Sequence, residues 1–287
     1  MEQPNVRKSI LLVLLVVVSL ASGRFFGQWP PHGTVEVRGL ELKSLLASVE
    51  GIAEEQPRVY KTREGYVRFM IAPPSAYFPV ESAKRGTPAK VAGAFLQRWR
   101  NLFVSDSSAV GFEIIRVNTQ NGRSYLRYRQ KYASLEVFGA EMIVQVNSAG
   151  GIEAVISDIM RKTDAIDSGK VLLNPVIDAL VAQKNAIDWV ALRHGQLRFV
   201  SSVPALMIFE PGVVGWEGET RLVWHTKVRS VDEVPIYLGL LVDAFSGETA
   251  FNYSLIAQAM TPREVREWPS RKPQQQKFGV DFSSKIC

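Results

Sequence analysis

The sequence is poor in the residues that most often carry chemistry, with one cysteine and three histidines among 287 residues. The cysteine is the last residue, Cys287, so we expect no internal disulfide and no cysteine nucleophile. The histidines His32, His194 and His225 lie far apart, and none belongs to an H-E-x-x-H zinc motif. A G-x-S-x-G elbow and a phosphate-binding glycine loop are also absent. We therefore expect no catalytic residue, no metal site, no cofactor and no enzyme activity in this chain.

A large excess of charge of one sign is absent as well. The sequence has 34 Lys and Arg residues against 28 Asp and Glu residues, for a net charge of +6. Nucleic-acid binding requires a basic patch with a motif that enters a groove, so this small excess predicts no nucleic-acid partner. With 46% hydrophobic and 22% charged residues, the composition is that of a globular protein with one large or two small domains.

The one long apolar run, Ile10 to Leu20, is too short to span a membrane, which takes about 20 apolar residues. Arg7 and Lys8 precede it, and small residues follow it before Arg24. This pattern is typical of an export signal over residues 1–23, with an uncleaved anchor as the alternative. We expect a secreted protein or one of the periplasm or cell envelope, which contacts the membrane only if the signal is uncleaved.

The first half of the remaining chain alternates between strand and helix patterns. Residues 24–57 form an N-terminal segment with a short amphipathic stretch, and Arg58 to Ile71 alternates around Glu64-Gly65 like a β-hairpin. Pro88 to Phe103 is predicted to be a helix, because bulky apolar residues recur there at helical spacing. They are Val91, Phe95, Leu96, Trp99, Leu102 and Phe103. This stripe must pack against a sheet or another helix.

A meander of antiparallel strands is predicted next, over Phe112–Thr119, Tyr125–Tyr132, Leu135–Asn147 and Ile152–Ile159. Asn121-Gly122 is a strong signal for a type I′ hairpin between the first two strands. One face of the second strand carries Leu126, Tyr128, Gln130 and Tyr132, and the other carries Tyr125, Arg127, Arg129 and Lys131. We expect the second, mostly basic face to be solvated.

The second half repeats this order of helix and strands. Asn174-Pro175 is predicted to start a helix over Val176–Trp189 that buries Ile177, Leu180, Val181 and Ile187. Strands are predicted over Leu206–Phe209, Arg221–Arg229, Ile236–Val242 and Glu248–Ser254. His225 lies on the second of these with Arg221, Lys227 and Arg229, and we interpret it as a surface histidine. Asp243 is expected to accept hydrogen bonds from its own turn.

The fold class predicted from these patterns is α+β, with two helix-plus-antiparallel-sheet modules in tandem. The boundaries are residues 1–23 for the signal, 24–57 for the N-terminal segment, 58–165 and 170–257 for the modules, and 258–287 for an extended tail or linker.

Short motifs in both modules resemble known domains. The stretches LRYRQKY (126–132), VFGAE (137–141) and VQVN (144–147) resemble the fungalysin/thermolysin propeptide domain. The stretches LVW (222–224) and LVDAFSGET (241–249) resemble the PepSY-type domain that follows it in the pro-regions of thermolysin-like zinc metallopeptidases. The motif positions are Arg127, Tyr128, Gln130, Tyr132, Phe138, Gly139, Ala140, Glu141, Asn147, Trp224, Asp243 and Gly247.

The resemblance implies a protein that inhibits a zinc metallopeptidase catalytic domain or assists its folding, in cis or in trans. It implies a candidate protease-contact segment that starts with Ala257, Gln258, Ala259, Met260 and Thr261, for which a disordered tail is the alternative. The aromatic motif residues are interpreted as packing residues, and Gly139 as a bulge or a close approach by a partner. Arg127, Arg129 and Lys131 either face an acidic protease surface or are simply solvated. The carboxylates Glu136, Glu141 and Asp243 are interpreted as face or turn residues.

Three functions remain open from the sequence. The first is a secreted, non-catalytic propeptide-like inhibitor or folding assistant of a thermolysin-like metallopeptidase. The second is the N-terminal pro-region of a truncated or frameshifted metallopeptidase precursor, because family precursors continue into an H-E-x-x-H domain that this sequence does not contain. The third is an envelope binding module with no protease partner.

Overall fold

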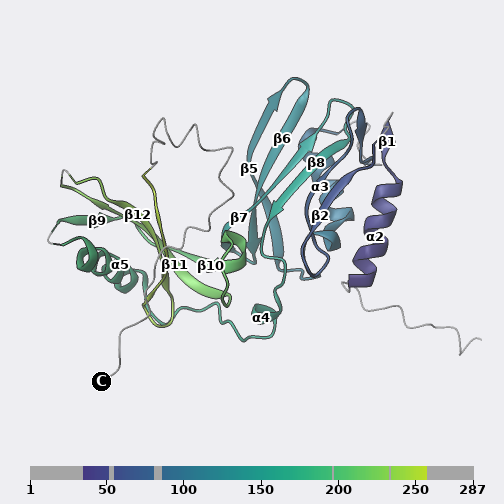
Figure 1. The fold of residues 1–287 in the computed structure, drawn as a ribbon. Coiled ribbons are helices and arrows are strands. Elements are labelled where there is room, and N and C mark those ends of the chain that lie inside the picture. The colour runs from purple at the N-terminus through teal and green to yellow at the C-terminus, as the bar shows by residue number, and fades with distance from the viewer. Residues whose placement is uncertain (1–34, 52–54, 81–85, 196, 233, 257–287) are drawn as a thin grey trace, which may run out of the picture.

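The computed structural model describes residues 35–51, 55–80, 86–195, 197–232 and 234–256. Within these residues the fold is mixed α+β, with four α-helices, a large curled sheet of eleven strands and a separate two-stranded sheet (Figure 1). None of the helices in the described ranges is long and apolar enough to cross a membrane. The expected signal over residues 1–23 and the contact segment that starts at Ala257 lie outside the described residues.

The first half opens with α2 (Val35–Ala47), then β1 (Glu50–Gly51), β2 (Arg58–Lys61), β3 (Val67–Ile71) and β4 (Ala76–Tyr77). The pairing of β2 with β3 confirms the predicted hairpin around Glu64-Gly65. Helix α3 (Pro88–Arg98) begins after Thr87, whose hydroxyl accepts a hydrogen bond from the Lys90 amide, and a 3₁₀ turn (Arg100–Leu102) extends it. The predicted helix is therefore confirmed, and its whole apolar stripe is buried.

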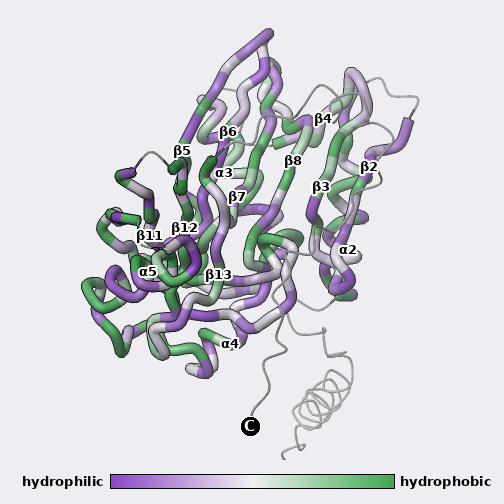
Figure 2. The backbone as a smooth tube through the Cα atoms, turned by 60° about the vertical axis from the view of Figure 1, so that its left-hand side comes forward, coloured by the Kyte–Doolittle hydropathy of each residue, from purple (hydrophilic) through white to green (hydrophobic). Residues whose placement is uncertain are grey.

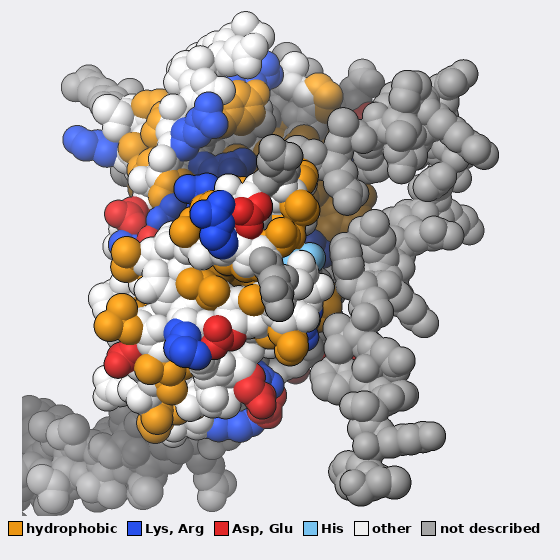
Figure 3. Space-filling model, turned by 90° about the vertical axis from the view of Figure 1, so that its left-hand side faces the viewer, with side chains coloured by type: hydrophobic (Ala, Val, Ile, Leu, Met, Phe, Trp, Pro, Cys, Tyr) orange, Lys and Arg blue, Asp and Glu red, His pale blue; other side chains and the backbone are white. Residues whose placement is uncertain are grey.

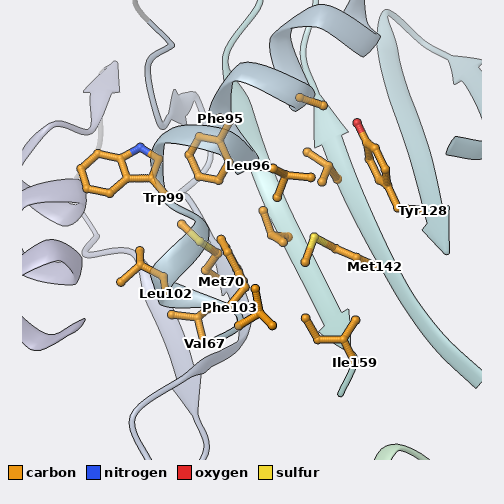
Figure 4. Close-up of a cluster of buried hydrophobic side chains, with 14 of the residues drawn as sticks. Val67, Met70, Phe95, Leu96, Trp99, Leu102, Phe103, Tyr128, Met142 and Ile159 are labelled. Atoms are coloured by element: carbon orange, nitrogen blue, oxygen red, sulfur yellow. The ribbon is translucent and has the colours of Figure 1, made fainter. Parts of the chain in front are cut away.

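The meander consists of β5 (Val110–Gln120), β6 (Arg123–Tyr132), β7 (Leu135–Val146) and β8 (Ile152–Asp158), as predicted. Asn121 and Gly122 have φ angles of 52° and 74°, the positive pair that a type I′ turn requires. Figure 2 shows the far end of the β5–β6 hairpin as hydrophilic, while the strands beside α3 carry apolar stretches. The predicted inner face of β6 is buried, and Figure 4 shows Tyr128 with Phe95, Leu96 and Met142 in this core.

The second half contains α4 (Asp164–Asp167), α5 (Ala179–His194), β9 (Phe199–Ser201), β10 (Ala205–Phe209), a 3₁₀ turn η4 (Pro211–Val214), β11 (Arg221–Ser230), β12 (Tyr237–Asp243) and β13 (Thr249–Ser254). The four predicted strands are confirmed within a residue or two, and β9 was not predicted.

The predicted start of α5 is wrong, and so are two of the four residues that were predicted to be buried. The helix begins after Asp178, whose carboxylate caps the Val181 amide at 2.8 Å, four residues past Pro175. The amides of Val176 and Ile177 instead donate to the Ala244 carbonyl, so tertiary contacts hold this stretch outside the helix. Leu180 and Val181 are 75% and 43% exposed, whereas Ile177 and Ile187 pack against the second-half core, as predicted. The small residues Ala182 and Ala186 and the β-branched Val190 are buried.

One sheet joins the two halves. Its main path runs β13-β12-β11-β10-β7-β8-β3-β2, and β10 lies parallel to β7 through the pairs Met207↔Glu136 and Ile208↔Val137. This parallel pairing was not predicted, because a tandem of antiparallel modules contains no signal for it. The junction at β7 and β10 therefore determines which side chains of the two halves meet.

Candidate interaction surface

A bulge in β7 forms the junction between the halves. The pairing of β6 with β7 passes from Arg129↔Glu141 to Lys131↔Glu136, so four residues of β7 lie opposite one residue of β6. Gly139 lies within this stretch with φ at +70°, and a Cβ atom there would approach Cγ1 of Val214 to 3.4 Å. A glycine is favoured at such a position because L residues with a side chain rarely adopt it. Of the two expected explanations for Gly139, the bulge is the one seen.

The bulge projects Phe138 into the second half. Its ring centroid lies 6.1 Å from that of Phe209, 6.2 Å from that of Phe251 and 5.6 Å from that of Tyr253. These separations are those of favourable aromatic pairs. Ala140, which follows Gly139, is buried in the first-half core. A single strand thus contributes to the packing of both halves.

His225 belongs to this aromatic cluster. Its ring centroid lies 5.4 Å from that of Phe138, and its Nε2 atom lies 3.0 Å from the Tyr253 hydroxyl. Burial lowers the pKa of the imidazole below its usual value, and the nearby Lys227 charge lowers it further against an opposing effect of Glu136. The interpretation as a surface histidine is wrong, because the side chain is half-buried under residues from β7 and β13.

The predicted basic face of β6 is partly exposed, but each of its cations is paired. Arg127 pairs with Glu141 at 3.1 Å, Arg129 with Glu136, and Lys131 with Glu113 at 2.7 Å. The hydrogen bond from Lys131 lowers the pKa of Glu113 below its usual range. Cross-strand pairs of this kind contribute about 0–1 kcal/mol each. These contacts make Glu136 and Glu141 face residues, as expected, and leave little net positive charge on β6.

Buried polar motif residues hold the end of the first half together. The Gln130 amide donates to the Met160 carbonyl at 2.7 Å, and its oxygen accepts from the Met160 amide at 2.8 Å. The Tyr132 hydroxyl donates to Asp167. Burial raises the pKa of Tyr128 to about 12, and its hydroxyl has no hydrogen-bond partner among the described residues. These aromatic residues pack in the core, as predicted.

The remaining motif residues stabilise turns. The Asn147 side chain accepts hydrogen bonds from the amides of Ala149 and Gly151. Asp243 does the same for Phe245 and Ser246, as expected, at 2.9 and 3.0 Å. Gly247 has φ at +77°, and its carbonyl accepts from the Asn185 side chain of α5. The Trp224 indole donates to the Ile177 carbonyl at 3.0 Å, which ties β11 to the segment before α5.

A pocket of about 350 Å³ lies between the segment after α4 and the second-half sheet. Its charged lining residues form the pairs Lys170–Glu219 at 2.8 Å and Arg221–Asp243 at 3.5 Å. Its apolar lining residues are Ala165, Val171, Leu172, Leu222 and Phe245. Sequence reasoning missed this pocket because its lining comes from segments far apart in the chain. In the described ranges, no three His, Cys, Asp or Glu side chains form a group that could hold a metal ion.

Comparison with known proteins finds one family model, the Fungalysin/Thermolysin Propeptide Motif, over residues 110–159. These residues are β5 to β8 with the residue that follows. No curated protein matches the chain. Among solved structures, the Bacillus megaterium YpeB C-terminal domain is similar at 10% sequence identity and a TM-score of 0.31, over 77% of this chain and 97% of that one. The sequence of the meander is thus related to the pro-regions of fungalysin and thermolysin.

Proposed function

We propose that the chain is a non-catalytic, propeptide-like protein that inhibits a thermolysin-like zinc metallopeptidase, assists its folding, or does both. The observation that carries the proposal is the match of residues 110–159 to the propeptide motif. In this proposal, residues 58–165 are the propeptide-like module and residues 170–257 a PepSY-like module. The protein acts outside the cytoplasm, secreted or in the periplasm or cell envelope, and its partner is the catalytic domain, in cis or in trans.

The junction of the halves supports a template role. Phe138 packs against rings from β10, β11 and β13, and two ladder pairs join β7 to β10. A preformed surface that binds a partner only in its native-like form stabilises that form by the free energy of binding. The same binding inhibits the peptidase if a segment of the chain occupies the active-site cleft. The segment that follows β13, residues 257–269, is our candidate for that segment.

Titration of peptidase activity tests the proposal. The purified full chain is added to thermolysin and to other thermolysin-like metallopeptidases. Their proteolysis of casein is then measured. We expect inhibition at nanomolar to micromolar concentrations. In a second assay the peptidases refold from denaturant, and we expect a higher yield of active enzyme with the chain present. No effect in either assay at high excess would overturn the proposal and favour an envelope binding module.

Deleting residues 257–287 separates the two activities. We expect the truncated chain to keep its circular dichroism spectrum and its effect on refolding, while its inhibition weakens. Unchanged potency would overturn the role of the segment in the cleft.

A further inference from the structure

The second-half sheet has one covered and one largely uncovered face. Helix α5 covers the first face, where Ala182, Ala186 and Val190 pack on Val228, Leu240 and Val242. Phe138 and Val214 pack over the inner part of the second face, where Phe209, Val223 and Leu241 are buried. The outer part of that second face faces solvent.

The register places a distinct set of residues on this outer part. Along β11, alternate residues change from buried Val223 through half-buried His225 to exposed Lys227 and Arg229. Val200 of β9 and Tyr237 of β12 lie on either side of Arg229 and are 40% and 36% exposed. Tyr253 of β13 lies beyond Gly239, and its ring covers that glycine. We call Val200, His225, Lys227, Arg229, Tyr237 and Tyr253 the basic–aromatic face.

The ion pairs among the described residues leave two cations of this face unpaired. Lys227 and Arg229 form no ion pair with any described residue. Glu136, whose charge acts on His225, pairs with Arg129, and Asp232, three residues after Arg229, pairs with Arg198. Figure 3 views the end of the molecule with α5 and β9, where Lys and Arg side chains gather in the upper half. Cations beside partly exposed tyrosine and valine side chains are complementary to a partner with carboxylates and apolar groups.

We infer that the basic–aromatic face docks an acidic polypeptide segment of the partner, in which carboxylates alternate with aliphatic or aromatic residues. The inference rests on the proposed function and names the surface that contacts the metallopeptidase. Carboxylates of the segment pair with Lys227 and Arg229, and its apolar side chains pack on Val200, Tyr237 and Tyr253. Nucleic acid fits this face less well, because two exposed cations neutralise few phosphates.

Peptide binding to charge-reversal variants tests the inference. The probe is a fluorescein-labelled peptide in which glutamate alternates with valine and tyrosine, and binding to the full chain is followed by anisotropy. We expect Lys227→Glu with Arg229→Glu to raise Kd by about tenfold or more. The matched control is Arg58→Glu with Lys61→Glu, because these cations are also exposed on a strand, β2, and form no ion pair with described residues. Its Kd should stay within about twofold of the wild-type value.

Three further readouts keep the inference falsifiable. Thermal unfolding checks that the variants fold. If the charge-reversal variant does not fold, the variant Lys227→Gln with Arg229→Gln replaces it. Equal Kd for the reversal and the control, or no binding of the peptide by the wild-type chain, overturns the inference. Tighter binding of a single-stranded oligonucleotide or of anionic phospholipid vesicles than of the peptide overturns the polypeptide partner. Peptide binding by a chain that neither inhibits nor refolds a peptidase would overturn the proposed function alone.

Discussion

The two halves bury their helices against the sheet in different ways. Helix α3 presents bulky side chains, with Phe95 and Leu96 among them, to β6 and β7. Helix α5 presents Ala182 and Ala186, so its backbone lies close to β11 and β12. Because hydrophobic stabilisation follows buried apolar area, the first interface depends on side-chain volume. The second depends on close approach and tolerates little added volume.

The central strands differ in their charges. The cations of β6 are all paired with glutamates across the sheet, whereas Lys227 and Arg229 of β11 form no ion pair among the described residues. Both strands looked equally basic in sequence. The difference shows that a basic strand indicates a binding surface only after its partners across the sheet are known.

The largest effect is expected from removing a bulky side chain of the first-half core at the C-terminal end of α3. Trp99 is 8% exposed, so Trp99→Ala should lower the free energy of unfolding by about 3–5 kcal/mol. The measurement is urea unfolding followed by circular dichroism. Leu192→Ala on α5 is the matched control, because Leu192 is 84% exposed and its loss should change stability by less than about 0.5 kcal/mol. If Trp99→Ala lowered the free energy of unfolding by less than about 1 kcal/mol, the claim that bulky side chains stabilise the first-half core would be contradicted.

Adding volume to the second interface should cost somewhat less. Ala186 is fully buried against the sheet, so Ala186→Leu should lower the free energy of unfolding by about 1–3 kcal/mol. The same urea titration measures it. A neutral or stabilising effect would show that α5 does not lie as close to β11 as its small residues indicate.

The backbone conformation of the bulge that joins the halves can be tested by substituting Gly139. Gly139→Ala should cost about 1–2 kcal/mol, because φ is +70° there. Gly93→Ala in α3 is the control with the opposite sign, since a Cβ atom at Gly93 meets nothing within 4 Å. Gly93→Ala should raise the free energy of unfolding by about 0.5–1 kcal/mol, measured by urea unfolding of both variants and the wild type. If both substitutions changed the free energy of unfolding equally, the claim that Gly139 has a strained backbone conformation would be contradicted.

The smallest effect is expected from pH. The folded-state pKa of His225 lies below its ordinary value of 6.5, so the unfolded chain binds more protons between the two values. The stability that neutral His225 contributes is therefore present above the unfolded pKa and is lost as pH falls toward the folded one. Urea unfolding at several pH values above the carboxylate range measures this slope, and His225→Phe should flatten it. An identical slope in both proteins would place His225 outside the aromatic cluster.

Much of the first half could be predicted because its signals are local. Thr87-Pro88 and the stripe from Val91 to Leu102 specify α3 within one segment. Asn121-Gly122 and the alternation of β6 specify the hairpin and its buried face. The sequence motifs marked their residues, but not the contacts that these residues make. The pairing of Gln130 with Met160 and the entry of Phe138 into the second half join residues far apart in sequence.

The start of α5 shows where local signals are insufficient. Asn174-Pro175 and Asp178 are both good helix starts, and hydrogen bonds from Val176 and Ile177 to Ala244 decide between them. By itself the sequence determined most of the elements, their turns and the alternation of the strand faces, because these depend on backbone preferences and side-chain period. Only the tertiary structure decided the parallel joint of β7 with β10, the burial of His225 and the open charges of β11. Those features depend on which distant strand supplies the neighbouring side chains, and no local pattern records that choice.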